Sequence, residues 1–345
     1  MSDSMTAPYD ALLIVSFGGP EGMDQVLPFL ENVLRGRNVP RERMLEVAHH
    51  YERFDGVSPL NAHLRELIAA LQSELNQHGP RLPIFWGNRN WHPLLPDTIR
   101  QMAEAGIRRA LAFVTSAYSS YSGCRQYLED IARARAVVGE PAPVVDKLRP
   151  FFNHPRFVAA NRDRLRDALE QVPSAGGRRD AVRVAFTAHS LPAAMAAGCD
   201  YERQLNEVCT LVSSDLKLPR DRWQLVYQSR SGRPEDPWLE PDALDHLKSL
   251  AASSVRDVIV MPIGFLSDHM EIQYDLDVEA RELCHRLGLN MIRAQTVGTH
   301  PEVIRMIRDL ILERIEPGAA SVAVGTLPAF PLVCPDDCCP GPPRH

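Results

Sequence analysis

The first apolar run of the chain is YDALLIVSFGGP, residues 9–20, and it leads straight into a polar turn rich in glycine. A second run, AVRVAFTAHSLP at residues 181–192, aligns with the first without a gap, and both end in proline. Such short runs, apolar from end to end, are typical of strands buried on both faces of a parallel sheet. The two runs therefore predict two halves that begin with the same strand and turn.

The same correspondence recurs further along each half. IRRALAFVTSAYSSY at residues 107–121 aligns with VRDVIVMPIGFLSDH at 255–269, and PIFWGNRN at 83–90 pairs with QLVYQSRS at 224–231. Likeness at several places in the same order indicates an internal repeat. We interpret it as a duplication.

Strand-like runs alternate with amphipathic stretches, as expected for βαβ units in an α/β fold with parallel sheets. We expect strands at residues 11–17, 83–88, 109–116, 182–188, 223–229, 257–265 and 290–297. We expect helices at residues 60–77, 96–106 and 241–253. Residues 134–156, rich in Ala, Pro and Arg, are expected to cross between the halves. We divide the chain into an N-terminal half (1–150), a C-terminal half (151–315) and an irregular cysteine-containing tail (316–345).

The composition of the 345 residues is ordinary for a globular protein, with 45% hydrophobic and 24% charged residues. The net charge of −6 gives no electrostatic support for nucleic-acid binding. The N-terminal sequence lacks the basic and apolar segments of a secretory signal, and the apolar runs are too short to cross a membrane. Seven cysteines in such a chain argue against a disulfide framework. We expect a cytoplasmic monomer without an integral membrane segment.

Polar residues gather where the predicted strands end, in the sequences SFGGP, GNRNWHP, TSAYSSYSG, AHSLP, QSRSG and GFLSDHME. Ligands of open parallel sheets bind beyond the carboxyl ends of the strands, which predicts one cleft shared by both halves. His189 and Glu271 follow two of these strands, where they can face each other and bind a divalent cation or move protons. Two separated residues form no motif, and a loop-bound histidine and a carboxylate at a helix N-terminus are the alternatives.

Three acidic residues, Glu271, Asp275 and Glu279, are spaced four apart just after the strand expected at 257–265. This spacing places them on one face of a helix, where like charges repel by roughly 0.2–0.5 kcal/mol per pair. An arrangement that costs stability suggests a function, and a solvated acidic face is the alternative.

Three cysteines, Cys334, Cys338 and Cys339, lie close together in the tail. Thiolates favour zinc or an iron–sulfur cluster, and a fourth ligand is then needed. Cys124, in a loop after a strand, is the first candidate, and Cys199, which follows the AHSLP loop, is the second. A tail with incidental cysteines is the alternative, and the adjacent Cys338 and Cys339 are hard to fit to a single ion.

Six motifs together resemble the ferrochelatases, the enzymes that insert ferrous iron into a porphyrin: LLIVSFGGPEG, GVSPLN, TSAYSSYSGCRQYLEDIARA, FTAHSLP, YQSRSGRPEDPWLEP and PIGFLSDHMEIQYDLDVEA. They follow the order of the family, and the resemblance runs from about residue 9 to residue 315. The sequences SFGGPEG, PFLENVLRGR and SSYSGCRQY are most similar to the actinobacterial branch, which resembles the enzymes that use coproporphyrin III. The resemblance implies iron insertion into coproporphyrin III in heme biosynthesis, with protoporphyrin IX as the alternative porphyrin.

The resemblance also implies two similar Rossmann-like domains with the porphyrin cleft between them. It makes His189 of HSLP and Glu271 of SDHME the catalytic pair that binds Fe²⁺ and exchanges protons. Asp268, Asp275 and Glu279 are then expected to relay protons or to draw iron inward.

For the porphyrin, the resemblance implies contacts from Ser58 of GVSPLN and Tyr127 of CRQYLED. Phe17 stands where some relatives carry a proximal tyrosine, so no oxygen from this residue approaches the iron. Arg89 and Arg230, each just beyond a strand, are expected to pair with propionates or to form an interdomain salt bridge.

Several branches of the family hold a [2Fe–2S] cluster on one internal and three C-terminal cysteines. The matching positions here are Cys124 and, with tighter spacing than is usual in the family, Cys334, Cys338 and Cys339. The resemblance therefore implies an iron–sulfur cofactor in addition to Fe²⁺ as substrate.

Two other functions stay open on the sequence alone. A cobalt or nickel chelatase acting on a corrin precursor shares the architecture but often depends on paired active-site histidines. A non-catalytic tetrapyrrole or metal carrier with a redox-sensing cluster also fits. For the enzyme, we expect a porphyrin as substrate, heme-pathway enzymes as possible recipients of the product, and no nucleic-acid partner.

Overall fold

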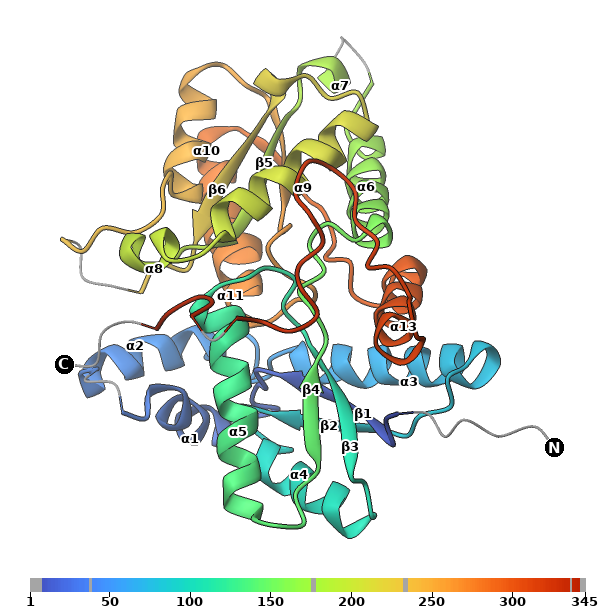
Figure 1. Cartoon of the computed structure of the whole chain (residues 1–345). Coiled ribbons are helices and arrows are strands. Elements are labelled where there is room, and N and C mark those ends of the chain that lie inside the picture. The colour runs from blue at the N-terminus through green and yellow to red at the C-terminus, as the bar shows by residue number, and fades with distance from the viewer. Residues whose placement is uncertain (1–7, 37–38, 175–177, 232–234, 336, 342–345) are drawn as a thin grey trace.

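Two four-stranded parallel sheets, one in each lobe of the molecule, form the framework of the chain (Figure 1). The computed structural model describes residues 8–36, 39–174, 178–231, 235–335 and 337–341. The first sheet, in the order β2–β1–β3–β4, comprises β1 (Ala11–Ser16), β2 (Ile84–Asn88), β3 (Arg109–Val114) and β4 (Val144–Lys147). The second, in the order β6–β5–β7–β8, comprises β5 (Arg183–His189), β6 (Trp223–Gln228), β7 (Asp257–Met261) and β8 (Asn290–Arg293). The identical strand order confirms the repeat predicted from the sequence.

Helices cover both faces of each sheet, because every second residue of a central strand points to the opposite face. The first sheet has α3 (Leu60–His78) on one face and α4 (Leu95–Glu104) with α5 (Gln126–Val138) on the other. The second has α6 (Pro155–Glu170) and α9 (Tyr201–Asp215) on one face, and α10 (Ala243–Ala252), η4 (Gln273–Ala280) and α12 (Arg281–Leu287) on the other. The remaining elements are α1 (Met23–Leu34), α2 (Arg41–Glu52), η1 (Tyr121–Arg125), α7 (Arg178–Ala181), α8 (Ala193–Ala197), η3 (Arg220–Arg222), α11 (Met270–Ile272) and α13 (Pro301–Ile315).

Strand β4 departs from the expectation for residues 134–156. This stretch contains the end of α5, the strand VVDK and the start of the linker, rather than a simple crossover. The strand has four residues, lies at the edge of its sheet and is partly exposed, so it carries little of the apolar signal that marks the central strands.

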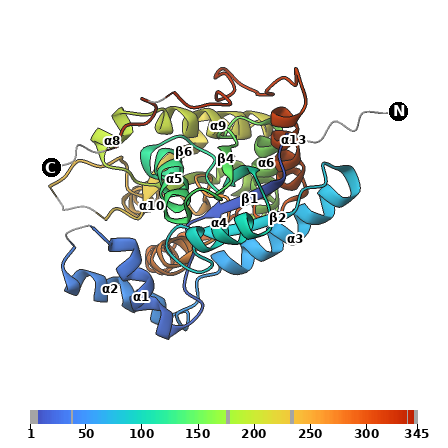
Figure 2. The ribbon, with the colours of Figure 1, turned by 60° about the horizontal axis from the view of Figure 1, so that its bottom comes forward.

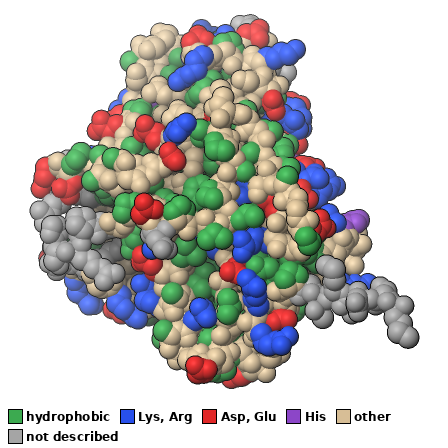
Figure 3. Space-filling view, viewed as in Figure 1, with side chains coloured by type: hydrophobic (Ala, Val, Ile, Leu, Met, Phe, Trp, Pro, Cys, Tyr) green, Lys and Arg blue, Asp and Glu red, His purple; other side chains and the backbone are tan. Residues whose placement is uncertain are grey.

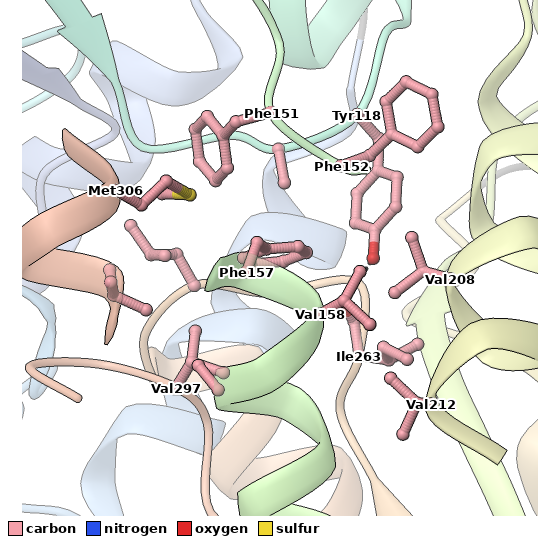
Figure 4. Packing of buried hydrophobic residues seen from close by; sticks show 14 of the residues in the cluster. Tyr118, Phe151, Phe152, Phe157, Val158, Val208, Val212, Ile263, Val297 and Met306 are labelled. Atoms are coloured by element: carbon pink, nitrogen blue, oxygen red, sulfur yellow. Dashed lines mark hydrogen bonds between the residues drawn. The ribbon is translucent and has the colours of Figure 1, made fainter. Parts of the chain in front are cut away.

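Aromatic side chains pack between the two lobes (Figure 4). The ring of Tyr118, after β3, lies 6.5 Å from the ring of Phe152 and 6.2 Å from that of Phe157, measured between centroids. Its buried hydroxyl donates a 2.9 Å hydrogen bond to the carbonyl oxygen of Ile263, after β7. The loops that correspond in the repeat therefore meet at the centre of one continuous core. A domain boundary near residue 150 stays a prediction, because the linker itself belongs to this core.

The hairpin of α1 and α2 stands apart from the first sheet and reaches the second half (Figure 2). Its apolar side packs on Met270, and the ring of His50 stacks on that of Tyr274 with 3.6 Å between centroids. Arg53, directly after α2, pairs with Glu282 at 3.1 Å. The hairpin thus joins the two halves beside the helix that carries the predicted acidic residues.

The tail after α13 runs along the linker between the halves. Arg149 in the linker and Glu313 in α13 form a buried ion pair with two hydrogen bonds of 2.7 and 2.8 Å. Arg149 also donates to the carbonyl oxygen of Val322 at 2.8 Å, and Asn153 donates to that of Leu327 at 2.8 Å. The tail carbonyl oxygens therefore accept hydrogen bonds from the linker side chains, while Oδ1 of Asn153 has no partner among the described residues.

Basic and acidic side chains are interspersed on the face shown in Figure 3. Among the residues that the structure describes, no helix combines the length and the apolar character that a membrane span requires.

Candidate active site

His189 is the last residue of β5 and lies beside Gln228, the last residue of β6. Its Nδ1 atom is 2.5 Å from the carbonyl oxygen of Ser190, which only accepts, so Nδ1 carries the proton and donates. The Nε2 atom then keeps its lone pair and lies 3.6 Å from Oε2 of Glu271. An imidazole in this tautomer can accept a proton or ligate a metal ion at Nε2.

Glu271 lies in the short helix α11, which follows β7 through a loop. The same carboxylate oxygen that faces His189 is 3.9 Å from Nδ1 of His269. Burial lowers the pKa of His269, so this second imidazole is held neutral. The part of the chain that the structure describes contains no group of three or more His, Cys, Asp or Glu side chains arranged as a preformed metal site. The site therefore offers a carboxylate flanked by two imidazoles without a closed set of ligands.

Glu271 was predicted as a site residue from the sequence, whereas His269 was missed. The signal was present, because His269 lies two positions before Glu271 in the same motif. Chelatases of corrin precursors often depend on paired active-site histidines. Because His269 and His189 both flank Glu271, a pair of histidines no longer distinguishes those enzymes from this chain.

The acidic row does not lie on one regular helix, as the spacing predicts. Glu271 is in α11, and Asp275 and Glu279 lie on the π-helix η4, whose hydrogen bonds span five residues. Asp275 is partly buried, and its Oδ2 accepts hydrogen bonds from the hydroxyl of Ser229 and, at 3.3 Å, from Nε2 of Gln228. Burial raises the pKa of Asp275 to about 7, and the charges of Glu271 and Glu279 act in the same direction.

Glu279, at the far end of the row, is exposed and lines a surface cavity of about 260 Å³ together with Lys248 and Arg286. Desolvation raises its pKa as well. The row thus begins at Glu271 beside the two histidines, passes through a partly buried carboxylate and ends at the outer surface.

Asp268 lies apart from this row. Its carboxylate forms an ion pair with Arg293 at 2.6 Å, and the same guanidinium binds Asp277 at 3.1 Å. Asp268 therefore precedes His269 in the chain, but its carboxylate is paired with Arg293.

Arg89 and Tyr127 lie together within the first half. The guanidinium of Arg89 pairs with Asp130 of α5 and stacks on the Tyr127 ring, with its carbon 3.8 Å from the ring centroid. Tyr127 is buried below it. Asp130 engages Nε of Arg89, and the buried Nη2 of the same guanidinium has no hydrogen-bond partner among the described residues. This ion pair joins residues of one half rather than two.

The other predicted porphyrin contacts differ in their exposure. Ser58 is buried against Gly19, where a Cβ atom would stand 2.7 Å from its hydroxyl oxygen. Phe17 is 37% exposed, and Arg230 is exposed in the loop after β6, where it donates to a nearby carbonyl oxygen at 2.7 Å. Of these three, Phe17 and Arg230 present surface to a ligand.

The tail brings the four predicted cluster cysteines to one region. The thiols of Cys124 and Cys334 lie close enough to act on each other, which raises the pKa of Cys124 and lowers that of Cys334 to about 7. The sulfur atoms of Cys338 and Cys339 are 3.5 Å apart. Cys199 lies near this pair, because Cys338 contributes to raising the pKa of Cys199, and Cys199 contributes to raising that of Cys339. The first and second candidates for the internal ligand therefore both lie near the tail.

The sequence pattern of the family described as Ferrochelatase matches residues 9–315 of this chain. The chain belongs to the ferrochelatase family. The match covers both sheets, α11 and the whole acidic row, and it leaves out only the N-terminal residues and the tail.

Several proteins named as ferrochelatases are similar to this chain along nearly their whole length. The Ferrochelatase of Rhodopirellula baltica is 53% identical over 339 residues, which cover 98% of this chain and 95% of that protein. The Coproporphyrin III ferrochelatase of Streptomyces coelicolor is 48% identical, over 99% of this chain and 96% of that protein. Among solved structures, the sirohydrochlorin chelatase SirB from Bacillus subtilis subspecies spizizenii, in complex with cobalt, superposes with a TM-score of 0.53 at 14% identity. That match covers 89% of this chain and 96% of SirB, and at this identity it shows the shared fold alone.

Membership of the family makes the chain an enzyme, a ferrochelatase that inserts Fe²⁺ into a porphyrin in heme biosynthesis and releases two protons. This confirms the function implied by the sequence motifs. It also decides against the non-catalytic carrier and the chelatase of a corrin precursor. Iron is here a substrate that must be bound, transferred and released.

Proposed function

We propose that this ferrochelatase inserts Fe²⁺ into coproporphyrin III in the cleft between its halves, at the pair His189 and Glu271. The observation that carries the proposal is the 3.6 Å separation between Nε2 of His189 and Oε2 of Glu271, two residues that follow different strands of one sheet. Membership of the family identifies the reaction as iron insertion, and the pair provides the imidazole and the carboxylate that this reaction needs.

Metal insertion exchanges one Fe²⁺ for two pyrrole protons, so the site has to accept protons as well as an ion. The lone pair on Nε2 of His189 accepts a pyrrole proton or ligates iron, and the carboxylate of Glu271 offers an oxygen ligand. Because these groups do not form a closed set of ligands, they bind iron loosely enough to pass it on. A porphyrin held bent in the cleft exposes the nitrogen lone pairs that a flat ring hides, and contacts remote from the metal supply that strain.

The acidic row provides a path for the released protons. A carboxyl group with a pKa of about 7, as on Asp275, both takes up and releases a proton near neutral pH. Glu279 opens onto the outer surface at the other end of the row. We propose that protons move from Glu271 through Asp275 to Glu279, while Asp268 serves the site only through its neighbour His269.

The choice of coproporphyrin III rests on relatives of that name, which are 47–48% identical to this chain. Coproporphyrin III carries four propionates and protoporphyrin IX two, so a preference is measurable as a difference in transition-state binding. Under anaerobic conditions we expect kcat/KM for Fe²⁺ insertion to be at least about tenfold higher with coproporphyrin III, the effect of one or two charge-assisted hydrogen bonds. Equal kcat/KM values for the two porphyrins would contradict the preference for coproporphyrin III. A higher kcat/KM with protoporphyrin IX would make that porphyrin the substrate.

We further propose that the tail holds a [2Fe–2S] cluster on Cys124, Cys334, Cys338 and Cys339. Such a cluster takes two cysteines on each of its two irons. The Cys334 thiol lies near that of Cys124, and the sulfur atoms of Cys338 and Cys339 are 3.5 Å apart, although the described residues contain no preformed group of three or more metal-binding side chains. A bound cluster supplies one-electron redox chemistry. The cysteines themselves tie the tail to the first half, and Cys199 lies near enough to replace one of them.

Freshly purified protein is expected to be reddish-brown and to contain about two iron and two sulfide ions per chain, as a [2Fe–2S] cluster requires. Cys124→Ser should lose this colour and iron content, whereas Cys284→Ala, in α12, should retain both. Colourless parent protein that contains zinc, or no metal, would remove the cluster from the proposal.

We also propose that the enzyme acts in the cytoplasm, because its seven cysteines are free thiols, as is usual in a reducing compartment. Its action as a monomer and the transfer of its product to another heme-pathway enzyme stay predictions.

A further inference from the structure

We propose that Ser229 and Gln228 are positioning residues for iron insertion, which turn the carboxylate of Asp275 so that one oxygen stays free to take the proton collected at Glu271. The inference rests on the proton path proposed above. It assigns a role to Gln228, the last residue of β6, and to Ser229 in the loop that follows: both orient the carboxylate of Asp275 for proton transfer.

The hydrogen bonds to Asp275 all fall on one of its two oxygens. The Ser229 hydroxyl and Nε2 of Gln228 both donate to Oδ2, and within the described ranges of the chain no donor reaches Oδ1. Gln228 is buried, and its own carbonyl oxygen Oε1 accepts nothing from the described residues. Among the described residues, the Gln228 amide therefore forms a hydrogen bond with Asp275 and takes part in no further side-chain hydrogen-bond network.

The backbone at Ser229, whose hydroxyl makes this contact, is in a strained conformation. Its φ angle is +60°, in the left-handed region that residues with a Cβ atom rarely adopt. Glycine would occupy this position without strain, but glycine has no hydroxyl group to offer. A conformational outlier whose side chain binds a carboxylate of the active-site helix is the pattern expected where strain serves function.

The free oxygen gives the proton transfer a defined acceptor. After Glu271 has taken up a pyrrole proton, its O–H bond breaks and a new O–H bond forms at Oδ1 of Asp275. Glu271 is then a carboxylate again, ready for the second pyrrole proton of the same turnover. Asp275 passes its proton to Glu279 and from there to solvent, so charge and protons balance.

The test is Ser229→Gly, with Ser254→Gly as the matched control. Ser254 has almost the same φ, +61°, but is exposed in the turn after α10. Both variants relieve strain, so we expect the Tm of each to equal or exceed that of the parent. Only Ser229→Gly should lower kcat, by about tenfold for the loss of one hydrogen bond to a charged group, with both KM values nearly unchanged. Ser229→Ala, which lacks the hydroxyl but keeps a Cβ atom, should show the same loss of kcat.

Asp275→Asn separates failure of this inference from failure of the proton path. If Ser229 acts through Asp275, the kcat loss of Ser229→Gly should be largely absent when it is added to Asp275→Asn. A normal kcat for Asp275→Asn would overturn the path itself. A low kcat for Asp275→Asn together with a normal kcat for Ser229→Gly and Ser229→Ala would overturn the positioning role alone. Loss of stability in Ser229→Gly without loss of kcat would also overturn it, because it would assign Ser229 to structure.

Discussion

Replacing His189 by alanine is expected to lower kcat for iron insertion by about 10²–10⁴-fold, the usual contribution of a positioned acid–base group. The reason lies in the Nε2 atom, which keeps its lone pair because Nδ1 donates to a carbonyl oxygen. Alanine removes the group that accepts a pyrrole proton or ligates the ion, and Glu271 then faces the porphyrin with His269 only. Anaerobic steady-state assays that follow loss of the free-porphyrin spectrum measure the effect.

The fold should tolerate this substitution, because the His189 side chain is about one-third exposed and its ring fills little of the core. His285→Ala, an exposed histidine of α12, provides the control and should leave kcat unchanged. Near-normal insertion by a well-folded His189→Ala protein would remove the central residue of the proposed site. It would leave the family and the fold as they are.

Arg149→Met is expected to lower the free energy of unfolding by about 3–5 kcal/mol, the usual cost of leaving one member of a buried ion pair alone. The side chain of Arg149 is 0% exposed and that of Glu313 is 5% exposed, so water cannot solvate the remaining carboxylate. The tail carbonyl of Val322 loses its donor in the same variant. Denaturant unfolding, followed by circular dichroism, measures the change.

Two further variants identify the cause of that loss. Arg149→Met combined with Glu313→Leu should recover most of the stability, because an apolar pair of similar volume often replaces a buried ion pair without cost. Arg43→Met breaks a pair with Glu46 that is more than half exposed on both sides, and should cost less than about 1 kcal/mol. An unchanged unfolding midpoint for Arg149→Met would show that the tail does not stabilise the linker.

The sequence predicted what depends on local pattern. All seven expected strands are present, because each contains a short apolar run of strand length. The edge strand β4 lacks that signal and was not predicted. The polar strand ends predicted that His189 and Glu271 face each other, and the two side chains lie 3.6 Å apart although 82 positions separate them in the sequence. Their catalytic role stays a prediction.

Properties set by distant neighbours were beyond the sequence. The sequence suggests that Arg89, just beyond a strand, is available to a ligand. In the structure its guanidinium forms an ion pair with Asp130, 41 positions later. Asp275 and Glu279 share one spacing and one charge, yet only Asp275 receives hydrogen bonds from the end of β6. Ser229 also has a left-handed backbone conformation, and the presence of a serine in the sequence does not predict it.

The ion pair that fixes the tail has a bearing on how the protein is made. Arg149 is synthesised 164 residues before Glu313 and 173 before Val322. The first half can fold while it emerges from the ribosome, but the charge of Arg149 stays in water until Glu313 has been synthesised. The buried ion pair between the linker and α13 therefore forms late, after both sheets of the chain have been made.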